Sequence, residues 1–286
     1  MSILANKIDF AALISVLNAN PNGDPLNGNR PRENYDGFGE ISDVCIKRKL
    51  RNRMQDMGYR VFVQSDDRSD DGFKSLRERA EGCIELKAEM KKGDREKCIK
   101  IACAQWLDVR SFGQVFAFKS LDATLGVSLG VRGPVSIHQA VSCSPIDIIS
   151  MQITKSVNSE SGKDRKSSDT MGMKHRVEFG LYLLKGSINC QLAEKTGFSE
   201  DDADVIKEAL KTLFVNDASS ARPDGSMEVC RLYWWKHREK TPSISSALVH
   251  RSLKIELADP NKTPKSFGDY AISNTLDLEP EVFSFV

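Results

Sequence analysis

The side chains best suited to chemistry lie in one loop, residues 18–32, which reads NANPNGDPLNGNRPR. Two Asn-Gly steps can supply the positive φ angles of tight turns, while three prolines fix φ and remove backbone donors. Turn amides and guanidinium groups suit phosphate oxygens, although a rigid loop without function is equally compatible with this composition. The candidate phosphate contacts in it are Asn20, Asn22, Gly23, Asn27, Gly28, Asn29, Arg30 and Arg32.

A second group of cations follows the loop on a predicted helix over 42–57. Ser42 can cap this helix, and an apolar stripe that includes Ile46 and Leu50 gives it one buried face. No acid lies between Asp43 and Asp56, whereas a solvated helix face normally mixes both signs of charge. We therefore predict phosphate contacts here, with Lys49 and Arg53, which stand four residues apart, sharing one outward face. The cations of this group are Lys47, Lys49, Arg51 and Arg53.

A third basic region, residues 155–176, separates apolar segments at 146–153 and 177–190 that are predicted to be strands. It holds six Lys or Arg residues and three acids, and it is rich in Ser, Asp and Gly. Two strands on either side of a polar tip predict a protruding hairpin, for which a disordered surface loop is the alternative. We favour a nucleic-acid contact because cations recur at both ends. Its candidate residues are Lys163, Arg165, Lys166, Met171, Met173, Lys174, His175 and Arg176.

The overall composition is that of a globular protein with no bulk charge. The chain has 286 residues, with 41 Lys and Arg against 40 acids, so nucleic-acid binding must come from local patches. No apolar run approaches the roughly 20 residues of a membrane span, and no signal-peptide pattern is present. The seven Cys form no C-x-x-C pair, which predicts neither disulfides nor a zinc site. We expect a cytoplasmic protein without membrane contact.

The sequence contains no recognisable catalytic motif. It has no P-loop, dinucleotide fingerprint or G-x-S-x-G, and its four histidines are far apart in sequence. We therefore predict no catalytic residues, no cofactor and no metal. The segment DVRSFG at 108–113 marks an element boundary, where we predict that Asp108 and Arg110 form a bridge that holds a turn.

The elements that would position these residues alternate between strands and helices. Residues 73–107 add two predicted helices that separate near Gly93, and the last fifty residues hold one possible strand at 252–257. Without insertions, the order is compatible with a ferredoxin-like β-α-β-β-α-β sheet, which is the fold of RNA-recognition modules, although their aromatic stacking signature is absent. The main elements are a strand at 9–17, a helix at 42–57, strands at 59–64 and within 135–191, a helix at 199–214 and a strand at 228–235.

Four segments together resemble a known family. They are NPNGDPLNGNRPR at 20–32, DVCIKRKLR at 43–51, DVRSFG at 108–113 and RGPV at 132–135. In this order they resemble the CRISPR-associated backbone subunit of type I Cascade complexes, a member of the RAMP superfamily, with type I-C as the nearest subtype.

The resemblance implies an α+β fold, with a ferredoxin-like or RRM-like palm that carries a helical finger insertion and a protruding thumb β-hairpin. It implies one elaborated RRM-like domain over 1–286. Its expected parts are a palm at about 8–64 and 108–250, a finger-like insertion at about 65–107, a thumb at about 155–176 and a tail at about 251–286.

The resemblance also implies the partners and the activity. Copies of the chain would stack into a helical filament along the CRISPR RNA (crRNA), beside other Cascade subunits, and target DNA would pair with the guide. A carrier that accepts any spacer must hold phosphates and leave base edges free, which agrees with the clustered cations. The function implied is that of a non-catalytic subunit that takes part in antiviral defence.

Two other functions remain open. Backbone subunits of the related type III complexes cleave RNA with an aspartate in the corresponding loop, and Asp24 occupies that loop here. Metal-dependent cleavage would need Asp24 exposed near the bound strand. The second alternative is a protein that binds a small phosphate compound through the same Gly-rich loop.

Overall fold

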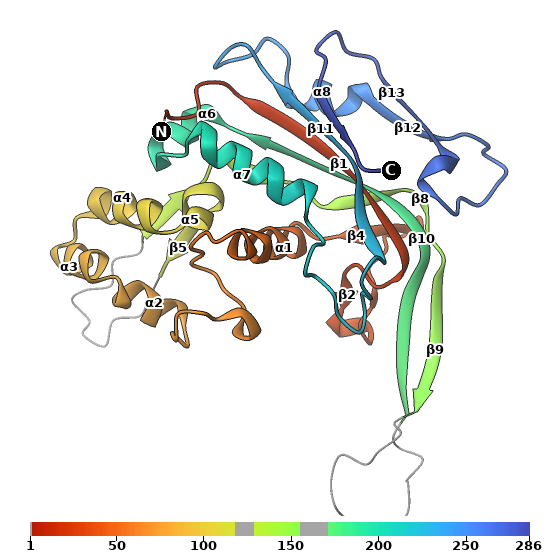
Figure 1. Cartoon of the computed structure of the whole chain (residues 1–286), viewed down its shortest axis with the longest axis horizontal. Helices are drawn as coiled ribbons and strands as arrows, with labels where there is room; N and C mark the ends of the chain where they lie inside the picture. Colours follow the sequence, from red (N-terminus) through yellow and green to blue (C-terminus); the bar gives the residue numbers. More distant parts are fainter. Residues whose placement is uncertain (1, 118–128, 155–170) are drawn as a thin grey trace, which may run out of the picture.

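One large antiparallel sheet organises the chain (Figure 1). The computed structural model describes residues 2–117, 129–154 and 171–286. Within these ranges the sheet has eight strands in the order β14-β11-β1-β10-β8-β4, and β7 and β9 also pair with β10. Its strands are β1 (Ile8–Ala19), β4 (Phe38–Ile41), β7 (Val135–Ile137), β8 (Ala140–Pro145), β9 (Ile148–Thr154), β10 (Met171–Ile188), β11 (Met227–Lys236) and β14 (Glu281–Ser284).

Strand β1 is the centre of this sheet, as its sequence predicts. It pairs with β10 along one edge and with β11 along the other. Phe10 and Ile14 belong to the core on one face, and Ala11 and Leu13 belong to the core on the other. A strand that is covered on both faces has no solvent side, which explains why its sequence is a continuous apolar run.

Helices α1 (Asp43–Asp56), α6 (Cys190–Thr196) and α7 (Glu200–Lys211) cover the first face of the sheet. The side chain of Ser42 caps α1, and Ser199 forms a capping box with Asp202 at the start of α7, so both predicted helix starts are confirmed. Figure 1 shows α1 and α7 side by side beneath β1 and β11. The apolar stripes of α1 and α7 are part of the hydrophobic core on this face of the sheet.

The second face is covered by elements from the end of the chain. Helix α8 (Ser246–Ser252) leads into a ribbon of β12 (Leu253–Leu257) and β13 (Tyr270–Asn274), with a 3-10 turn at Phe267–Asp269 between the two strands. Val249, Leu253 and Tyr270 pack there against Tyr233 and Trp235 of β11. The predicted strand at 252–257 is therefore confirmed. Helix α8, β13 and β14 were not predicted.

A helical lobe stands beside the sheet with a core of its own (Figure 1). The predicted break at Gly93 is confirmed, because Gly93 ends α3 in the left-handed conformation (φ 75°). The prediction of two helices over 73–107 is wrong in number, since three lie there. The lobe contains α2 (Leu76–Gly82), α3 (Ile84–Lys92), α4 (Arg95–Gln105), α5 (Leu107–Phe112), β5 (Gly113–Phe116) and β6 (Leu129–Arg132), with a 3-10 turn at Asp66–Arg68 before it.

The predicted strand at 59–64 is wrong, because a carboxylate takes the place of a neighbouring strand. The fully buried Asp108 accepts hydrogen bonds from the amides of Phe62 (2.7 Å) and Val63 (3.1 Å), and from Nε of Arg51 (2.9 Å). These amides need no strand partner, so the segment stays irregular although its residues alternate. The predicted bridge from Asp108 to Arg110 is wrong too, since Arg110 forms two hydrogen bonds of 2.8 Å with Asp202.

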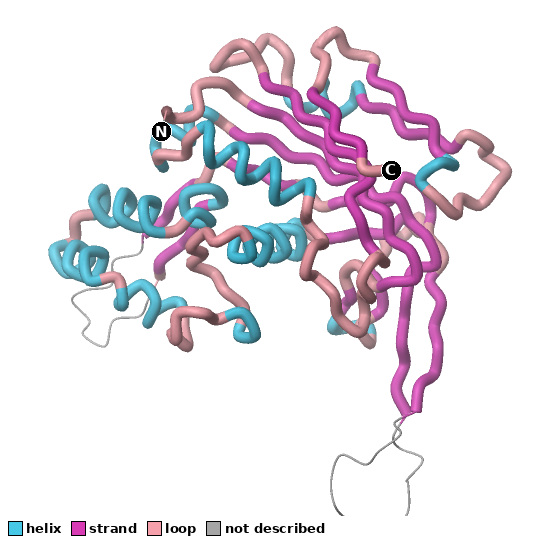
Figure 2. Tube along the Cα trace, in the orientation of Figure 1, coloured by secondary structure: helices cyan, strands magenta, loops and turns pink. Residues whose placement is uncertain are grey.

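Strands β9 and β10 form a long hairpin that projects beyond the sheet (Figure 2). Their register runs from Ile148 opposite Val177 to Thr154 opposite Met171. The protruding hairpin is thus observed in its two legs, while the predicted polar tip at 155–170 lies outside the described residues. No described helix combines the length and the apolar character that a membrane crossing requires.

Replacing Asp108 with alanine is predicted to destabilise the fold strongly. The change leaves two buried amides and the Arg51 guanidinium without their hydrogen-bond acceptor. We therefore expect a loss of about 3 kcal/mol or more in the free energy of unfolding. Urea denaturation followed by circular dichroism measures this loss. Asp277→Ala, at an exposed position, is the control and should change stability by less than about 0.5 kcal/mol. Similar small losses in both variants would contradict the role given to Asp108.

Candidate nucleic-acid interface

The loop at 18–32 folds into a small ribbon at the end of β1. Strands β2 (Gly23–Asp24) and β3 (Arg30–Pro31) pair, and a 3-10 turn at Pro25–Asn27 joins them. The second Asn-Gly step has the predicted positive φ at Gly28 (56°), and Asn29, which follows it, is also left-handed (φ 61°). The first step does not, since Gly23 lies in β2 without a positive φ. Glycine is needed there because a Cβ would collide with the Asn29 side chain.

Two of the asparagines that were predicted to contact phosphate form hydrogen bonds that stabilise the loop. Asn20 is 3% exposed and its Nδ2 donates to the Asn29 carbonyl at 2.7 Å, while its buried Oδ1 has no partner among the described residues. Oδ1 of Asn22 accepts from the Ser42 amide at 2.9 Å, which ties the loop to the start of α1. By contrast, Asn27, Gly28 and Asn29 are exposed at the tip of the ribbon.

The loop is joined to the hairpin through side chains. Nη1 of Arg30 donates to Oγ of Ser150 on β9 at 3.2 Å, and the same Oγ lies 2.8 Å from Nδ1 of His175 on β10. Nε of Arg30 also lies 3.7 Å from Glu33, whereas Nη2 of Arg32 pairs with Asp24 at 3.2 Å. Arg30 thus links the loop to the hairpin, and Arg32 is held within the loop.

A cavity of about 280 Å³ lies where the loop and the hairpin meet. The loop contributes Asn20, Gly28 and Asn29 to its lining, and β10 contributes Met173, Lys174 and His175. The structure therefore brings together residues from two of the three predicted basic regions. The antiparallel register explains this, because Ala19 at the end of β1 pairs with Val177, where β10 leaves the sheet.

Part of the cavity wall was missed by sequence reasoning. Ser220 and Ala221 line it, and the Ala221 carbonyl accepts from the Asn20 amide at 2.9 Å. The segment around them is rich in Ser, Asp, Pro and Gly, which predicts a turn but not its location. Only the pairing of β1 with β11 brings this turn beside the loop.

The remaining hairpin candidates differ in exposure. Met171 and Met173 are 55% and 54% exposed, and Lys174 is exposed beside them. Arg176 is half-buried at the base of the hairpin, and within the described ranges its Nε has no hydrogen-bond partner. The other three predicted hairpin cations, Lys163, Arg165 and Lys166, lie outside the described residues.

The second group of cations, on α1, does not form a free cationic face. Lys49 is 3% exposed and forms an ion pair with Asp217, while Nε of Arg53 donates to Oγ1 of Thr212 at 2.7 Å. The prediction that Lys49 and Arg53 share one outward face is therefore wrong. Burial lowers the pKa of the Lys49 ammonium, and Asp217 opposes that shift.

The two other predicted contacts on α1, Lys47 and Arg51, are also paired with acids. Arg51 donates to Asp108 and lies over the Phe112 ring, and Lys47 pairs with Asp43 at 3.1 Å. The sequence analysis did not find the partners Asp108 and Asp217, because both are far from α1 along the chain. No group of three or more His, Cys, Asp or Glu residues in the described ranges is arranged to hold a metal ion.

Comparison with known proteins decides the family. The model of the family "CRISPR-associated protein Cas7" matches residues 6–275. The chain belongs to the Cas7 family. Its fold is also similar to a solved chain of a "CRISPR RNA-guided surveillance complex, pre-nicking", with a TM-score of 0.50, 15% identity, and coverage of 84% of this chain and 80% of that chain.

A curated Cas7 relative comes from Haloferax volcanii. This "CRISPR-associated protein Cas7" is 27% identical over 218 residues, which cover 70% of this chain. The matched part is 61% of the relative's own length, so the chain spans about three fifths of that protein. The family membership suggested by the four segments at 20–32, 43–51, 108–113 and 132–135 is thus confirmed.

Replacing Asp217 with alanine is predicted to cost much more stability than breaking a surface pair on the same helix. The change leaves the Lys49 ammonium buried without its counter-charge, so we expect a loss of about 3 kcal/mol or more. Thermal and urea unfolding measure it. Asp43→Ala, which removes the surface partner of Lys47, should cost less than about 1 kcal/mol. Equal losses would show that the buried pair is no stronger than a surface one.

Proposed function

We propose that this Cas7-family protein is a non-catalytic backbone subunit of a type I-C CRISPR surveillance complex. It binds the phosphate backbone of crRNA without reading sequence, and copies of it stack along the guide beside other Cascade subunits in the cytoplasm. The guide then pairs with target DNA. The observation that carries this proposal is the meeting of the 18–32 loop and the β9–β10 hairpin around one cavity.

The sheet supports an RRM-like palm for this function. Strands β11, β1, β10 and β8 are neighbours in that order, and every adjacent pair is antiparallel. Helices α1 and α7 lie on one face and connect these strands in β-α-β-β-α-β order, which is the ferredoxin-like arrangement. The helical lobe corresponds to the proposed finger and the β9–β10 hairpin to the thumb.

The contacts with RNA that we propose are fewer than the cations in the sequence. Lys174 and His175 line the cavity together with the exposed turn at Gly28 and Asn29. Arg30, which follows this turn and donates to Ser150 on β9, completes the proposed set. Of the other candidates, Asn27 and the hairpin residues 163, 165, 166, 171, 173 and 176 remain proposed RNA contacts. The α1 cations, Asn20 and Asn22 instead stabilise the fold around the site.

The first test is RNA affinity as a function of salt. We expect similar affinity for unrelated single-stranded RNAs, with the logarithm of the association constant falling linearly with the logarithm of salt concentration. Arg30→Ala/Lys174→Ala should weaken binding about tenfold or more and reduce the salt slope by about 1.4, because each phosphate that is no longer neutralised lowers the slope by roughly 0.7.

The matched control for this test is Lys262→Ala/Lys265→Ala, which removes two exposed cations from the loop between β12 and β13. Its affinity and salt slope should equal those of the unchanged protein. Equal weakening in both double variants would contradict the proposed site. A strong preference for one RNA sequence would contradict backbone binding.

The second test concerns cleavage by Asp24, the catalytic alternative. The Asp24 carboxylate caps the Leu26 amide at 3.2 Å and pairs with Arg32 at 3.2 Å, so it already has two partners. We predict that the assembled complex does not cut complementary RNA in the presence of Mg²⁺. Cleavage that Asp24→Ala abolishes would overturn this prediction. Gel analysis of end-labelled RNA, with Asp277→Ala as control, makes the measurement.

A further inference from the structure

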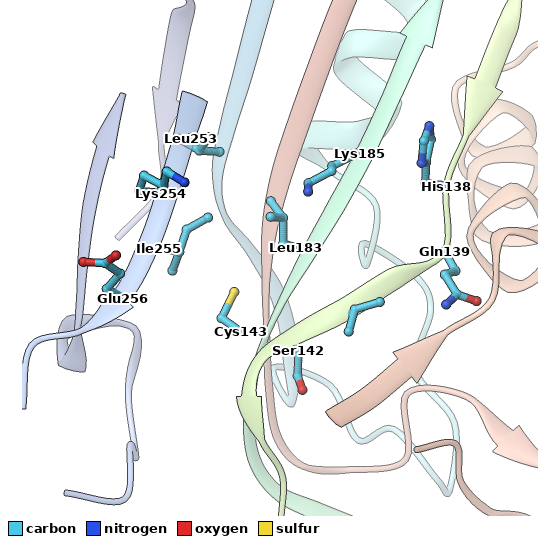
Figure 3. A pocket seen from close by; sticks show the side chains of 11 residues that line it. His138, Gln139, Ser142, Cys143, Leu183, Lys185, Leu253, Lys254, Ile255 and Glu256 are labelled. Atoms are coloured by element: carbon cyan, nitrogen blue, oxygen red, sulfur yellow. The ribbon is translucent and has the colours of Figure 1, made fainter. Parts of the chain in front are cut away.

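A groove of about 570 Å³ lies on the second face of the sheet, away from α1 and α7 (Figure 3). Strands β8 and β10 form one wall, and β12 forms the other. Cys143, Leu183 and Ile255 give the groove an apolar floor. A cavity of this size lies within the range of sites that bind ligands or peptide segments.

Two lysines extend into the groove from opposite walls. Figure 3 shows the side chains of Lys185 on β10 and Lys254 on β12 directed into the space between these strands, while the Glu256 carboxylate turns away from them. In the described part of the chain, neither lysine has a carboxylate partner. Two lysines and one acid, Glu256, line the groove, so it carries a net positive charge above an apolar floor.

The β12 wall presents a strand edge. Four consecutive residues, Leu253–Glu256, line the groove, and because side chains alternate between faces, only an edge can expose all of them. Hydrogen bonds from the Ala258 amide to Asp269 (2.9 Å) and from the Thr275 amide to Ser252 (3.0 Å) continue the ladder with β13.

Even-numbered residues of β12 therefore exchange backbone bonds with β13, and the backbone groups of Ile255 and Leu257 point the other way. Among the described strands, none pairs with this second edge. An unpaired edge presents donors and acceptors at the spacing of another strand.

We propose that this groove binds an extended, acidic segment of a partner protein. The segment adds as a strand to the free edge of β12, buries an apolar side chain on the floor, and places a carboxylate between Lys185 and Lys254. A protein segment fits better than RNA, because alternating backbone donors and acceptors match a strand and the floor is apolar. This site is separate from the loop and hairpin, and it does not depend on the proposed RNA binding.

The test uses the full chain and a fluorescent hexapeptide of alternating valine and glutamate, acetylated and amidated at its ends. Fluorescence anisotropy should show saturable binding, and hydrogen exchange should slow at the Ile255 amide when the peptide is present. A hexapeptide of alternating valine and lysine should not bind. No saturable binding of the acidic peptide up to about 1 mM would overturn the proposal.

Two variants separate the charge from the strand edge. Lys185→Glu/Lys254→Glu should weaken peptide binding about tenfold or more, whereas Lys262→Glu/Lys265→Glu, a matched double charge reversal outside the groove, should leave it unchanged. Ile255→Pro removes one outward amide without removing a bond to β13, and it should weaken binding about three- to tenfold.

The outcomes that contradict the proposal are distinct. Unchanged binding in the double lysine variant, or unchanged hydrogen exchange at Ile255, would show that the peptide binds elsewhere. Displacement of the peptide by single-stranded RNA would assign the groove to nucleic acid instead. If Ile255→Pro fails to fold, as judged by circular dichroism, the lysine variants and the hydrogen-exchange measurement still test whether the peptide binds in the groove.

Discussion

The pairing of β1 along both edges is the constraint on which the rest of the structure depends. Its register with β10 places Ala19 opposite Val177, so β1 ends where β10 leaves the sheet. The loop after β1 must therefore emerge beside the base of the hairpin. A shift of one residue would turn every side chain of β1 to the other face, so the buried cores on both faces fix this register. The position of the 18–32 loop at the candidate site is therefore set by the packing of β1 in the sheet, far from the loop itself.

The chain is nearly neutral overall, but its cations are of two kinds. Some form ion pairs that stabilise the fold, and others line a groove or a cavity. Arg51 and Lys49 form ion pairs with Asp108 and Asp217, and these pairs join α1 to segments that are distant in the sequence. Lys174, Lys185 and Lys254 line open spaces instead. Since a paired, buried cation is held by its counter-charge, the cations that remain available to an anionic partner are those of the second kind, and the total count of cations does not give their number.

Local patterns in the sequence predicted what depends on neighbouring residues. The apolar run of β1, the Ser42 cap and the capping box at Ser199 were all predicted, because each needs only residues within one element. The segment at 59–64 was mispredicted, since Asp108 lies more than forty residues away and satisfies its amides. At the candidate site, the loop and hairpin were predicted separately, but their contact through Arg30, and the wall at 220–221, depend on strand pairing.

Strand β10 carries both proposed binding regions, at its two ends. Lys174 and Lys185 are eleven residues apart on this strand, which at about 3.3 Å per residue puts them roughly 36 Å apart along it. That separation is several Debye lengths at physiological salt, so charge at one region has little direct effect on the other. Any coupling between an RNA and a protein segment would need β10 to move, yet its pairing with β1 and β8 opposes such movement. The two proposed regions therefore lie too far apart for direct electrostatic competition between their ligands.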